Sequence, residues 1–520
     1  MGEGFRQGVV VRSPFERLSG EERERLDRAS RSILEEVGLQ CFNDEAADVF
    51  ARNGCAVTRE DERSFRVKIP GAVLGEAVKR APSRVKLGAR DPRNALVLDA
   101  RLPRVYFGSG SETNIWLDAH METFRSEEDP SRRRRLAVFT ERRGTVARLA
   151  RAARLAEQLE HLDFFIRPVN VQDEDITEQN HDVNKFYASL ANTTKHVMAG
   201  LTSLSQLDNV LRMAELIAGG KEALKDNPVV SFITCTVKSP LQMVDDATQK
   251  LIEFARREVP FVVSSSPQGG STAPVQEAGM VAQINAEILS GIALSQMVNP
   301  GAPVVYGSVP VRSRMDNLHD MYGAPEFNRY NVDCVQMARH YGVPCYSTAG
   351  VGDSSVPGMQ ATLEKIFTYL PVAMSGAQYI HYAFGLLERT NVFCPVQAVL
   401  DNQHIGMVKM FLESPRVSEE DIGASLEQIR KVMASRQKLY VRFVRRGLRD
   451  GSVYAHYPFE GADGTDGVIE KALARLEELW SRPVRALPGE VKDAVFEGVP
   501  GILGRLREDA REEMIKEGNR

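Results

Sequence analysis

A helix followed by a short apolar strand recurs seven times between residues 144 and 385, and this repeat limits the possible folds more than any other feature of the chain. Each strand segment is largely apolar, which is typical of parallel strands that are buried on both faces. In α/β proteins, helices placed between such strands cover a parallel sheet. The predicted strands are 162–170, 196–201, 229–235, 261–266, 304–308, 345–347 and 378–385.

The spacing of these units separates two kinds of parallel sheet. One unit takes about 30–45 residues over a total of roughly 250, which favours a (β/α)8 TIM barrel within an α/β fold. No Gly-x-Gly-x-x-Gly motif follows the first strand, which argues against a dinucleotide-binding sheet. An eighth strand is less clear, because residues 393–399 are also compatible with a loop or a helix.

The regions on either side of the repeat have a different character. Residues 1–135 combine helices with short strands and predict an α+β N-terminal extension, whose first helix follows Ser19 and stops at Gly38. Residues 136–404 form the predicted barrel, and residues 405–520 form a helical C-terminal region. We expect this last region to be a cap or an oligomer interface, and the protein to be a homo-oligomer.

The composition narrows the classes of function. Lys and Arg number 66 against 70 Asp and Glu, so the net charge of −4 provides no field that favours nucleic acid or anionic membranes. No segment has about 18 uninterrupted apolar residues, and the N-terminus lacks the apolar core of a signal peptide. We therefore expect a cytoplasmic protein with no nucleic-acid or membrane partner.

Six cysteines and nine histidines form no recognisable metal motif. Cys-x-x-Cys, His-x-His and His-Glu-x-x-His patterns are absent, so we predict no metal site. Cys235 and Cys345 lie near the ends of predicted strands. That position leaves a nucleophilic role open, beside the commoner role of a small buried side chain.

The loop between Tyr346 and Glu364 is the first candidate site, because active-site groups of a parallel barrel follow its strands. Asp353 is the acid within this glycine- and serine-rich turn. Gln360 and Glu364 are four residues apart and share one helix face, which points either to the barrel mouth or to solvent. Asp353 and Glu364 are therefore candidate catalytic residues.

Two further strand ends carry polar candidates. His381 lies in an otherwise apolar strand, where it is either a catalytic residue or a buried histidine satisfied by a neighbour. Arg312 either clamps a carboxylate with its planar guanidinium or pairs with Asp316. The strand ends contain few acids and many aromatic and hydroxyl residues, a composition that suits a ligand held by aromatic faces.

Six segments carry a resemblance to a known family. They are ILEEVG (33–38), VYFGSG (105–110), NTTKHV (192–197), SSSPQGGSTAPV (264–275), GAPVVYGS (301–308) and GDSSVPGMQA (352–361). In this order the chain resembles the trimethylamine methyltransferase family, whose members transfer a methyl group from a methylated amine to a corrinoid protein. The resemblance implies a (β/α)8 barrel whose mouth receives the amine and then the cobalamin of the partner protein, so that this chain itself binds no cofactor tightly.

The resemblance also narrows the substrate. The founding enzymes of the family carry pyrrolysine in the loop after the sixth strand, whereas the loop from Ser347 to Gln360 contains only ordinary residues. The chain is therefore similar to the branch without pyrrolysine, in which quaternary amines such as glycine betaine are substrates. A quaternary ammonium already carries a positive leaving group, so a Co(I) nucleophile can attack its methyl carbon without an added activator.

Within that resemblance, aromatic residues would bind the cation. Tyr306, Tyr382 and Phe384 are the expected cage, since aromatic faces attract quaternary ammonium groups. Phe107 and Trp116 lie in a glycine-rich segment outside the repeat. They would either contribute to the same cation-binding surface or belong to a hairpin packed on the barrel.

Polar residues would take the remaining roles. His381 is expected to orient the substrate, and Arg312 to bind its carboxylate. Asp353, Gln360 and Glu364 would line the side of the site that pyrrolysine occupies in the founding enzymes and favour the cation electrostatically.

Two other classes of function remain open. One is a barrel lyase or aldolase with Asp353 or His381 as the base. The absence of a strand-end lysine in an obvious Schiff-base setting counts against it, although Lys238 lies near one strand end. The other is a non-catalytic methylammonium-binding protein that has lost its corrinoid partner.

Overall fold

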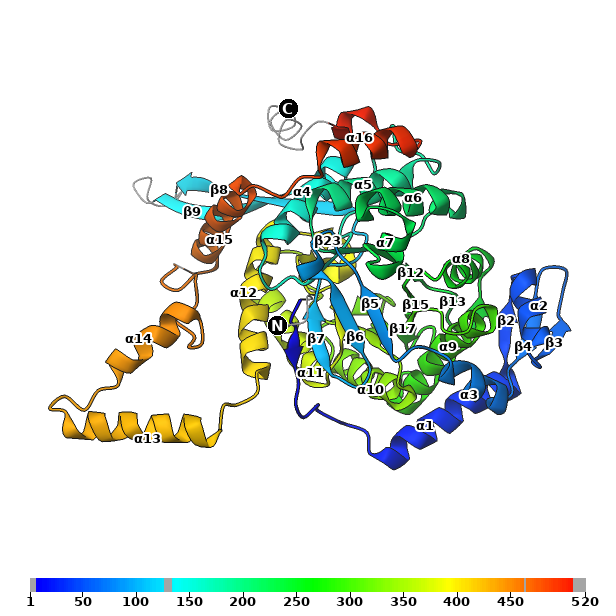
Figure 1. Cartoon of the computed structure of the whole chain (residues 1–520), viewed down its shortest axis with the longest axis horizontal. Helices are drawn as coiled ribbons and strands as arrows, with labels where there is room; N and C mark the ends of the chain where they lie inside the picture. The colour runs from blue at the N-terminus through cyan, green and yellow to red at the C-terminus, as the bar shows by residue number, and fades with distance from the viewer. Residues whose placement is uncertain (1–5, 126–132, 463, 508–520) are drawn as a thin grey trace.

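The computed structural model describes residues 6–125, 133–462 and 464–507, and a curled sheet of nine strands lies at its centre (Figure 1). Eight of the strands are parallel, and β1 pairs with β7 in the antiparallel sense. The chain is therefore a mixed α/β protein whose main sheet is rich in parallel strands. In spatial order the strands are β1 (Val9–Val10), β7 (Arg104–Phe107), β21 (Tyr379–His381), β20 (Cys345–Thr348), β17 (Val304–Ser308), β15 (Phe261–Ser265), β12 (Val230–Thr234), β11 (His196–Gly200) and β10 (Phe164–Ile166).

The first and last parallel strands of this sheet, β7 and β10, also meet each other. Gly108, directly after β7, forms a parallel bridge with Phe164 of β10. The Asp163 N–H donates to the Phe107 carbonyl at 2.7 Å. The curl therefore brings the two ends of the eight parallel strands together over one short stretch.

The strand beside β21 comes from the N-terminal part of the chain. β7 pairs with β21 and supplies the eighth parallel strand that the sequence left unclear. Residues 393–399 instead contain the end of β23 (Val392–Phe393) and the first turn of a helix. A long antiparallel ribbon, β8 (Ile115–Arg125) and β9 (Arg133–Arg143), separates β7 from the repeat, so periodicity could not identify it.

Helices cover the outer side of the sheet, as the repeat predicts. The helix α9 is buried all round from Met280 to Gln296, because α1 (Gly20–Ser32) and α3 (Gly71–Lys79) pack over it. The helices between and after the strands are α4 (Val146–Gln158), α5 (His181–Asn192), α6 (Leu207–Ala218), α7 (Lys221–Asp226), α8 (Asp245–Arg256), α9 (Glu277–Val298), α10 (Pro325–Tyr341), α11 (Met359–Met374) and α12 (Pro395–Leu412).

Side chains alternate between the two sides of each strand, and two separate hydrophobic clusters result. The inner cluster is enclosed by the curl and includes Tyr106, Tyr346 and Tyr379. The larger outer cluster fills the space between the strands and the helices. The place of a residue in this alternation decides whether its side chain faces the interior of the curl or a helix.

A hairpin covers the amino ends of the strands. It consists of β5 (Arg84–Leu87) and β6 (Leu96–Asp99), whose side chains Val85 and Leu96 belong to the inner cluster. His196, the first residue of β11, places its Nδ1 2.6 Å from the Gly88 carbonyl oxygen. The hairpin therefore closes the interior of the curl at the amino ends of the strands. A site that reaches this interior would lie at the carboxyl ends.

The N-terminal extension confirms the predicted first helix. Ser19 and Glu22 form a capping box at the start of α1, and a π-helical turn, η1 (Ile33–Val37), follows it. The chain then turns at Gly38, whose φ of +76° favours glycine. A small sheet and one helix follow, made of β2 (Leu39–Cys41), α2 (Asp44–Arg52), β3 (Ala56–Arg59) and β4 (Phe65–Lys68) with β13 (Val237–Lys238) and β14 (Gln242–Met243).

The C-terminal region is helical, and a break separates two of its helices. Residues 418–441 contain α13 (Glu419–Ala434) and a break before α14 (Val441–Asp450), because Ser435 is extended and Lys438 has a φ of +52°. In Figure 1, α13 and α14 extend away from the body, and α15 (Gly464–Ser481) returns to pack on α12 and α4 before α16 (Gly489–Gly498). Within the described ranges, no helix is both long and apolar enough to cross a membrane.

Candidate functional site

The carboxyl ends of four strands of the main sheet bring six side chains together, and we name this group the mouth cluster. The His381 ring lies between two phenol rings, 4.0 Å from the Tyr346 centroid in a stacked arrangement and 3.7 Å from that of Tyr382. The strands β12, β15, β20 and β21 supply the group, which consists of Cys235, Ser264, Tyr346, Thr348, His381 and Tyr382.

The hydrogen bonds of His381 define its state. Its Nε2 lies 2.7 Å from Thr348 Oγ1, and that hydroxyl donates to the Ser308 carbonyl, so we assign the imidazole proton to Nε2. The buried Nδ1 has no hydrogen-bond partner within the described part of the chain. Burial holds the pKa of His381 well below its usual range. The site therefore contains a neutral imidazole with an unused acceptor.

A glycine allows the rings to approach. A Cβ at Gly110 would lie 2.9 Å from Tyr382 Cδ1 and 3.4 Å from His381 Nδ1. Tyr382 itself adopts a φ of +67°, a backbone conformation that is uncommon for a bulky residue. Together these features place the Tyr382 ring over His381 at the end of β21.

Cys235 marks where the cluster opens to solvent. The residue is exposed, yet the surrounding protein raises the pKa of its thiol, as expected for a group that lines a recess. Its Sγ lies 2.9 Å from Ser264 Oγ. Because a raised pKa keeps the thiol protonated near neutral pH, Cys235 is a poor nucleophile.

Asp353, Gln360 and Glu364 are brought together, and they form hydrogen bonds with backbone N–H groups and with one another. The Asp353 carboxylate accepts hydrogen bonds from the Tyr322 N–H at 2.9 Å and the Gly323 N–H at 3.0 Å. Glu364 accepts from the Asp353 N–H and from Gln360 Nε2, each at 2.8 Å. Burial raises the pKa of Asp353. These three residues therefore brace the loop that follows β20 against the loop before α10.

A strained turn carries a cation near the braced loops. Glu388, Arg389 and Thr390 have φ values of +46°, +54° and +74°, a left-handed run that costs roughly 1–2 kcal/mol per residue. The Arg389 N–H donates to the Gly352 carbonyl at 3.1 Å and fixes the turn to the loop. The Arg389 charge opposes the rise in the pKa that burial causes at Asp353 and at Asp320.

Asp320 joins this turn to the mouth cluster. It lies in a small rim sheet beyond the main strands, formed by β16 (Gln268–Gly269), β18 (Val311–Ser313) and β19 (Asp320–Met321). Its carboxylate accepts from Gln268 Nε2 at 2.8 Å, and its charge contributes to the raised pKa of Tyr382. An acid, a cation and two phenols therefore share the carboxyl end of the sheet.

Four of the predicted aromatic residues face the outer hydrophobic cluster instead of the mouth cluster. The Tyr306 hydroxyl donates to Asn285 Oδ1 of α9, and Phe107 meets the ring of Tyr369 on α11 edge to face. Phe384 is buried in the same outer cluster. Trp116, on β8, packs against Phe393. Among the predicted cage residues, only Tyr382 lies beside His381.

Arg312 lies on the rim sheet, turned toward α10. Its Nη1 is 3.7 Å from Met321 Sδ, and its Nε is 3.9 Å from Glu326 Oε1. Within the described residues, its hydrogen bond and its ion pair are therefore with the rim sheet and α10, not with the mouth cluster.

The structure also shows residues to which the sequence assigned no role. Tyr346 opens the predicted loop, but only the strand alternation reveals that its ring faces inward. Arg167, at the end of β10, is buried and pairs with Glu112, while its Nε and Nη1 have no hydrogen-bond partner in the described part of the chain. Burial lowers the pKa of Arg167 to about 9. In the sequence, only its position directly after an apolar strand indicates that Arg167 has a role.

In the described ranges, no three His, Cys, Asp or Glu side chains are placed to hold a metal ion. The mouth cluster offers aromatic faces and neutral polar groups. Such a set suits an organic cation better than a metal or a phosphate.

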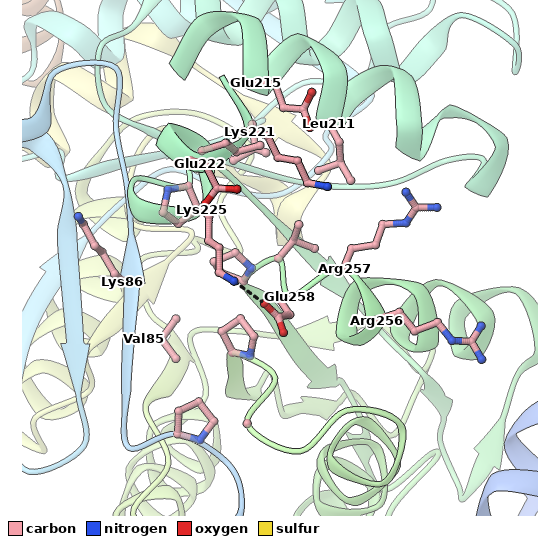
Figure 2. A pocket seen from close by; sticks show the side chains of 18 of the residues that line it. Val85, Lys86, Leu211, Glu215, Lys221, Glu222, Lys225, Arg256, Arg257 and Glu258 are labelled. Carbon is pink, nitrogen blue, oxygen red and sulfur yellow. Dashed lines mark ion pairs between the residues drawn. The ribbon is translucent and has the colours of Figure 1, made fainter. Parts of the chain in front are cut away.

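A large cavity lies at the other end of the sheet. It has a volume of about 1090 Å³, and its walls include Pro228, Pro260 and Pro303, which precede or begin the strands β12, β15 and β17. Figure 2 shows charged side chains of both signs around it, with Lys225 Nζ 3.3 Å from Glu258 Oε2. None of the candidate residues of the mouth cluster lines it.

Comparison with known proteins gives a consistent result over most of the chain. The family model described as trimethylamine methyltransferase (MTTB) matches residues 5–440. The trimethylamine methyltransferase MttB of Desulfitobacterium hafniense is 30% identical over 477 residues, 90% of each chain. That of Methanosarcina thermophila is 31% identical, over 90% of this chain and 94% of the relative. A glycine betaine methyltransferase of Desulfitobacterium hafniense is 26% identical over 80% of this chain and 81% of its own length.

Proposed function

Because the chain belongs to the trimethylamine methyltransferase family, we propose that it transfers a methyl group from a quaternary amine of the glycine betaine type to the corrinoid of a partner protein. The observation that carries this proposal is the mouth cluster, where the neutral His381 lies between the rings of Tyr346 and Tyr382. Each aromatic contact with a quaternary ammonium contributes about 0.5–2 kcal/mol, depending on how far the contact excludes water.

The architecture supports the same proposal. We propose that the curled sheet is a (β/α)8 barrel, with β7 from residues 1–135 beside seven strands from residues 136–404 and a helical region after residue 404. The Gly108–Phe164 bridge supports closure of this barrel. The carboxyl ends of the strands are then its mouth, which is where enzymes of this architecture place their chemistry.

We propose that the corrinoid of a partner protein approaches the mouth from the solvent side. Cys235 is exposed at the end of β12, so a group carried by a partner protein can approach the inner rings from solvent. A corrinoid supplies a reduced cobalt nucleophile that accepts the methyl group. This chain would hold the ammonium against the mouth cluster, beside the rings of Tyr382 and His381, and needs no proton donor because the amine departs neutral.

The bracing residues act on the position of the site. The carboxylates of Asp353 and Glu364 accept hydrogen bonds from backbone N–H groups. We therefore propose that they hold the loops around the mouth and do not react. Gln360 supports Glu364 in this role. Tyr306, Phe107, Phe384 and Trp116 have no part in the proposed cage, because their contacts are to the helix layer and the ribbon.

We assign the carboxylate of the substrate to Arg389 rather than to Arg312. Arg389 acts electrostatically on Asp320, which in turn acts on Tyr382, whereas Arg312 contacts Met321 and Glu326 on the rim sheet. A guanidinium offset from an aromatic cage matches a betaine, whose anion lies a short distance from its cation. The strained turn at Arg389 also fits a functional position.

The decisive experiment mixes the protein with chemically reduced cobalamin and a panel of amines. Methylation of cobalt, seen as a change in the absorbance spectrum, together with release of the demethylated amine, supports the proposal. Binding of amines without turnover, with cobalamin or with a purified corrinoid protein, would instead identify a methylammonium-binding protein. Carbon–carbon bond cleavage without cobalt methylation would identify a barrel lyase or aldolase.

The carboxylate assignment has its own matched test. Arg389→Ala should weaken the binding of glycine betaine by about tenfold or more relative to that of choline, since a lost charge-assisted hydrogen bond costs about 1.5–3 kcal/mol. Arg312→Ala is the control and should affect both ligands alike. The reverse pattern would return the carboxylate to Arg312.

A further inference from the structure

The helices α13 and α14 form an arm that has little contact with the rest of its own chain. The arm leaves the body after α12 and returns at α15 (Figure 1). Neither helix makes extensive contact with another described helix or strand, and Val432 is the buried residue of α13. Most helices of this length owe their stability to tertiary packing, so an arm of this kind requires a partner.

The arm carries an apolar seam. Ile422, Leu426, Ile429 and Met433 are all exposed, with Leu426 at 47% and Met433 at 60%. Their spacing of four, three and four residues puts them on one face of α13, in the pattern of a helix that packs against another helix. Contiguous apolar surface of this kind marks an interaction site.

The body carries a second uncovered stripe. Met359, Leu363 and Phe367 are spaced four residues apart on α11 and are 85%, 69% and 45% exposed. The stripe lies close to the root of the arm, because a Cβ at Gly358 would be 4.0 Å from Thr465 Cγ2, where α15 begins. One chain thus carries two exposed apolar surfaces of helical spacing, and neither covers the other.

We propose that the arm packs on a second copy of this chain, with the α13 seam of each copy covering the α11 stripe of the other. Such an exchange is reciprocal, as a two-fold interface requires. It places α13 of the partner copy beside α11, whose first turn follows the loop that Asp353 and Glu364 brace. The proposal does not depend on the methyl-transfer function.

The charges of the arm favour a protein partner of the same kind over a membrane. The first turn of α13 is acidic, with Glu419, Glu420 and Asp421, whereas α14 carries four arginines. Anionic lipid would attract the arginines of α14 but repel the acidic turn that begins the seam helix. Two arms that approach around a two-fold axis can place the acidic turn of one near the basic helix of the other.

Sedimentation of the full chain at micromolar concentration tests the proposal first. We expect a dimer or a multiple of it, and we expect Leu426→Glu with Ile429→Glu, or Leu363→Glu with Phe367→Glu, to weaken association about 100-fold while the circular dichroism of the body is retained. Glu427→Gln is the matched control, because it changes the same helix outside the seam and should leave association unchanged. A monomeric native chain would overturn the proposal, also if that monomer binds vesicles of phosphatidylserine and phosphatidylcholine.

Cross-linking identifies which surfaces meet and does not depend on the stability of the glutamate variants. In a Cys235→Ser background, which removes the exposed cysteine, Leu363→Cys and Leu426→Cys copies are mixed and treated with a bifunctional maleimide. The proposal expects a covalent dimer in the mixture and far less with either copy alone. A cross-link confined to one chain in the double variant, or equal cross-linking of Leu426→Cys alone, would overturn it.

Discussion

The two ends of the main sheet differ in both cavity volume and chemistry, and the larger cavity is not at the end where we place the site. The amino end has a cavity of about 1090 Å³ lined by charges of both signs, and the carboxyl end has a compact group of rings around His381. Val85 lines the cavity and also belongs to the inner cluster, so the β5–β6 hairpin lies between the cavity and the interior. The chemistry of the lining, rather than its volume, separates a site from a surface hollow.

We expect the largest effect on amine binding from a substitution in the mouth cluster, at the carboxyl end of the sheet. Tyr382→Leu removes one aromatic face from the proposed cage, and a loss of up to about 2 kcal/mol corresponds to roughly 30-fold weaker binding of a quaternary amine. Calorimetric titration measures it. Tyr382→Phe keeps the ring and should bind almost normally, so an equal loss in both variants would assign the effect to the hydroxyl instead.

A steric change should give the next largest effect. Gly110→Ala puts a Cβ 2.9 Å from Tyr382 Cδ1, which displaces the ring, and we expect about a tenfold loss of turnover at unchanged fold. Gly200→Ala is the matched control at the end of another strand, β11, because its Cβ would meet nothing closer than 3.6 Å. Steady-state kinetics of both variants measure the difference; similar losses would mean that Tyr382 has room to move.

The braced loop should show a smaller, pH-dependent effect on stability. Burial raises the pKa of Asp353 in the fold above its usual value of about 4, so the folded state holds this proton more tightly than the unfolded state. Its contribution to stability is therefore complete below that usual value and is lost as the pH rises through the raised pKa. Asp353→Asn should remove this dependence.

Melting temperatures of the native chain and Asp353→Asn between pH 4 and pH 7 check the sign. The stability of the native chain relative to the variant should fall as the pH rises over this window. A relative gain in stability would mean that the carboxylate is stabilised in the fold by the Tyr322 and Gly323 N–H groups more than burial disfavours it.

The smallest effect is expected at the amino end. Lys225→Ala breaks the Lys225–Glu258 pair, but both side chains are largely exposed, so the pair contributes at most about 1 kcal/mol. Turnover should stay within about twofold of the native value. A large loss of turnover would join the charged cavity to the function and remove the contrast between the two ends.

The candidate site could be predicted only in part, and the aromatic residues show why. His381 and Tyr382 were located from their place at a strand end, and the structure puts their rings together. Tyr306 has an equally good position in the sequence but faces α9, while Tyr346, which had no predicted role, faces inward. Because both faces of a buried parallel strand are apolar, its sequence does not tell which side chains face the interior and which face the helices.

The acids show a second limit. Their spacing put Gln360 and Glu364 on one helix face, and the hydrogen bond between them confirms it. Whether that face met a ligand depended on the loop before α10, because Asp353 and Glu364 find their partners in backbone N–H groups. Nearly every residue has a backbone N–H group, so the sequence does not indicate which of these groups will bind a given carboxylate.

The sequence by itself determined the class of this protein. Seven repeats of helix and strand, with strands too apolar to face water, require a parallel sheet with helices outside it, and the ordered segments identify the family. The tertiary structure decided the rest: β7 as the eighth parallel strand, the inward rings of Tyr346 and Tyr382, and the uncovered seam of α13. Periodicity is local, whereas strand order, the inner face and surface contacts depend on residues far apart in the chain, which only packing brings together.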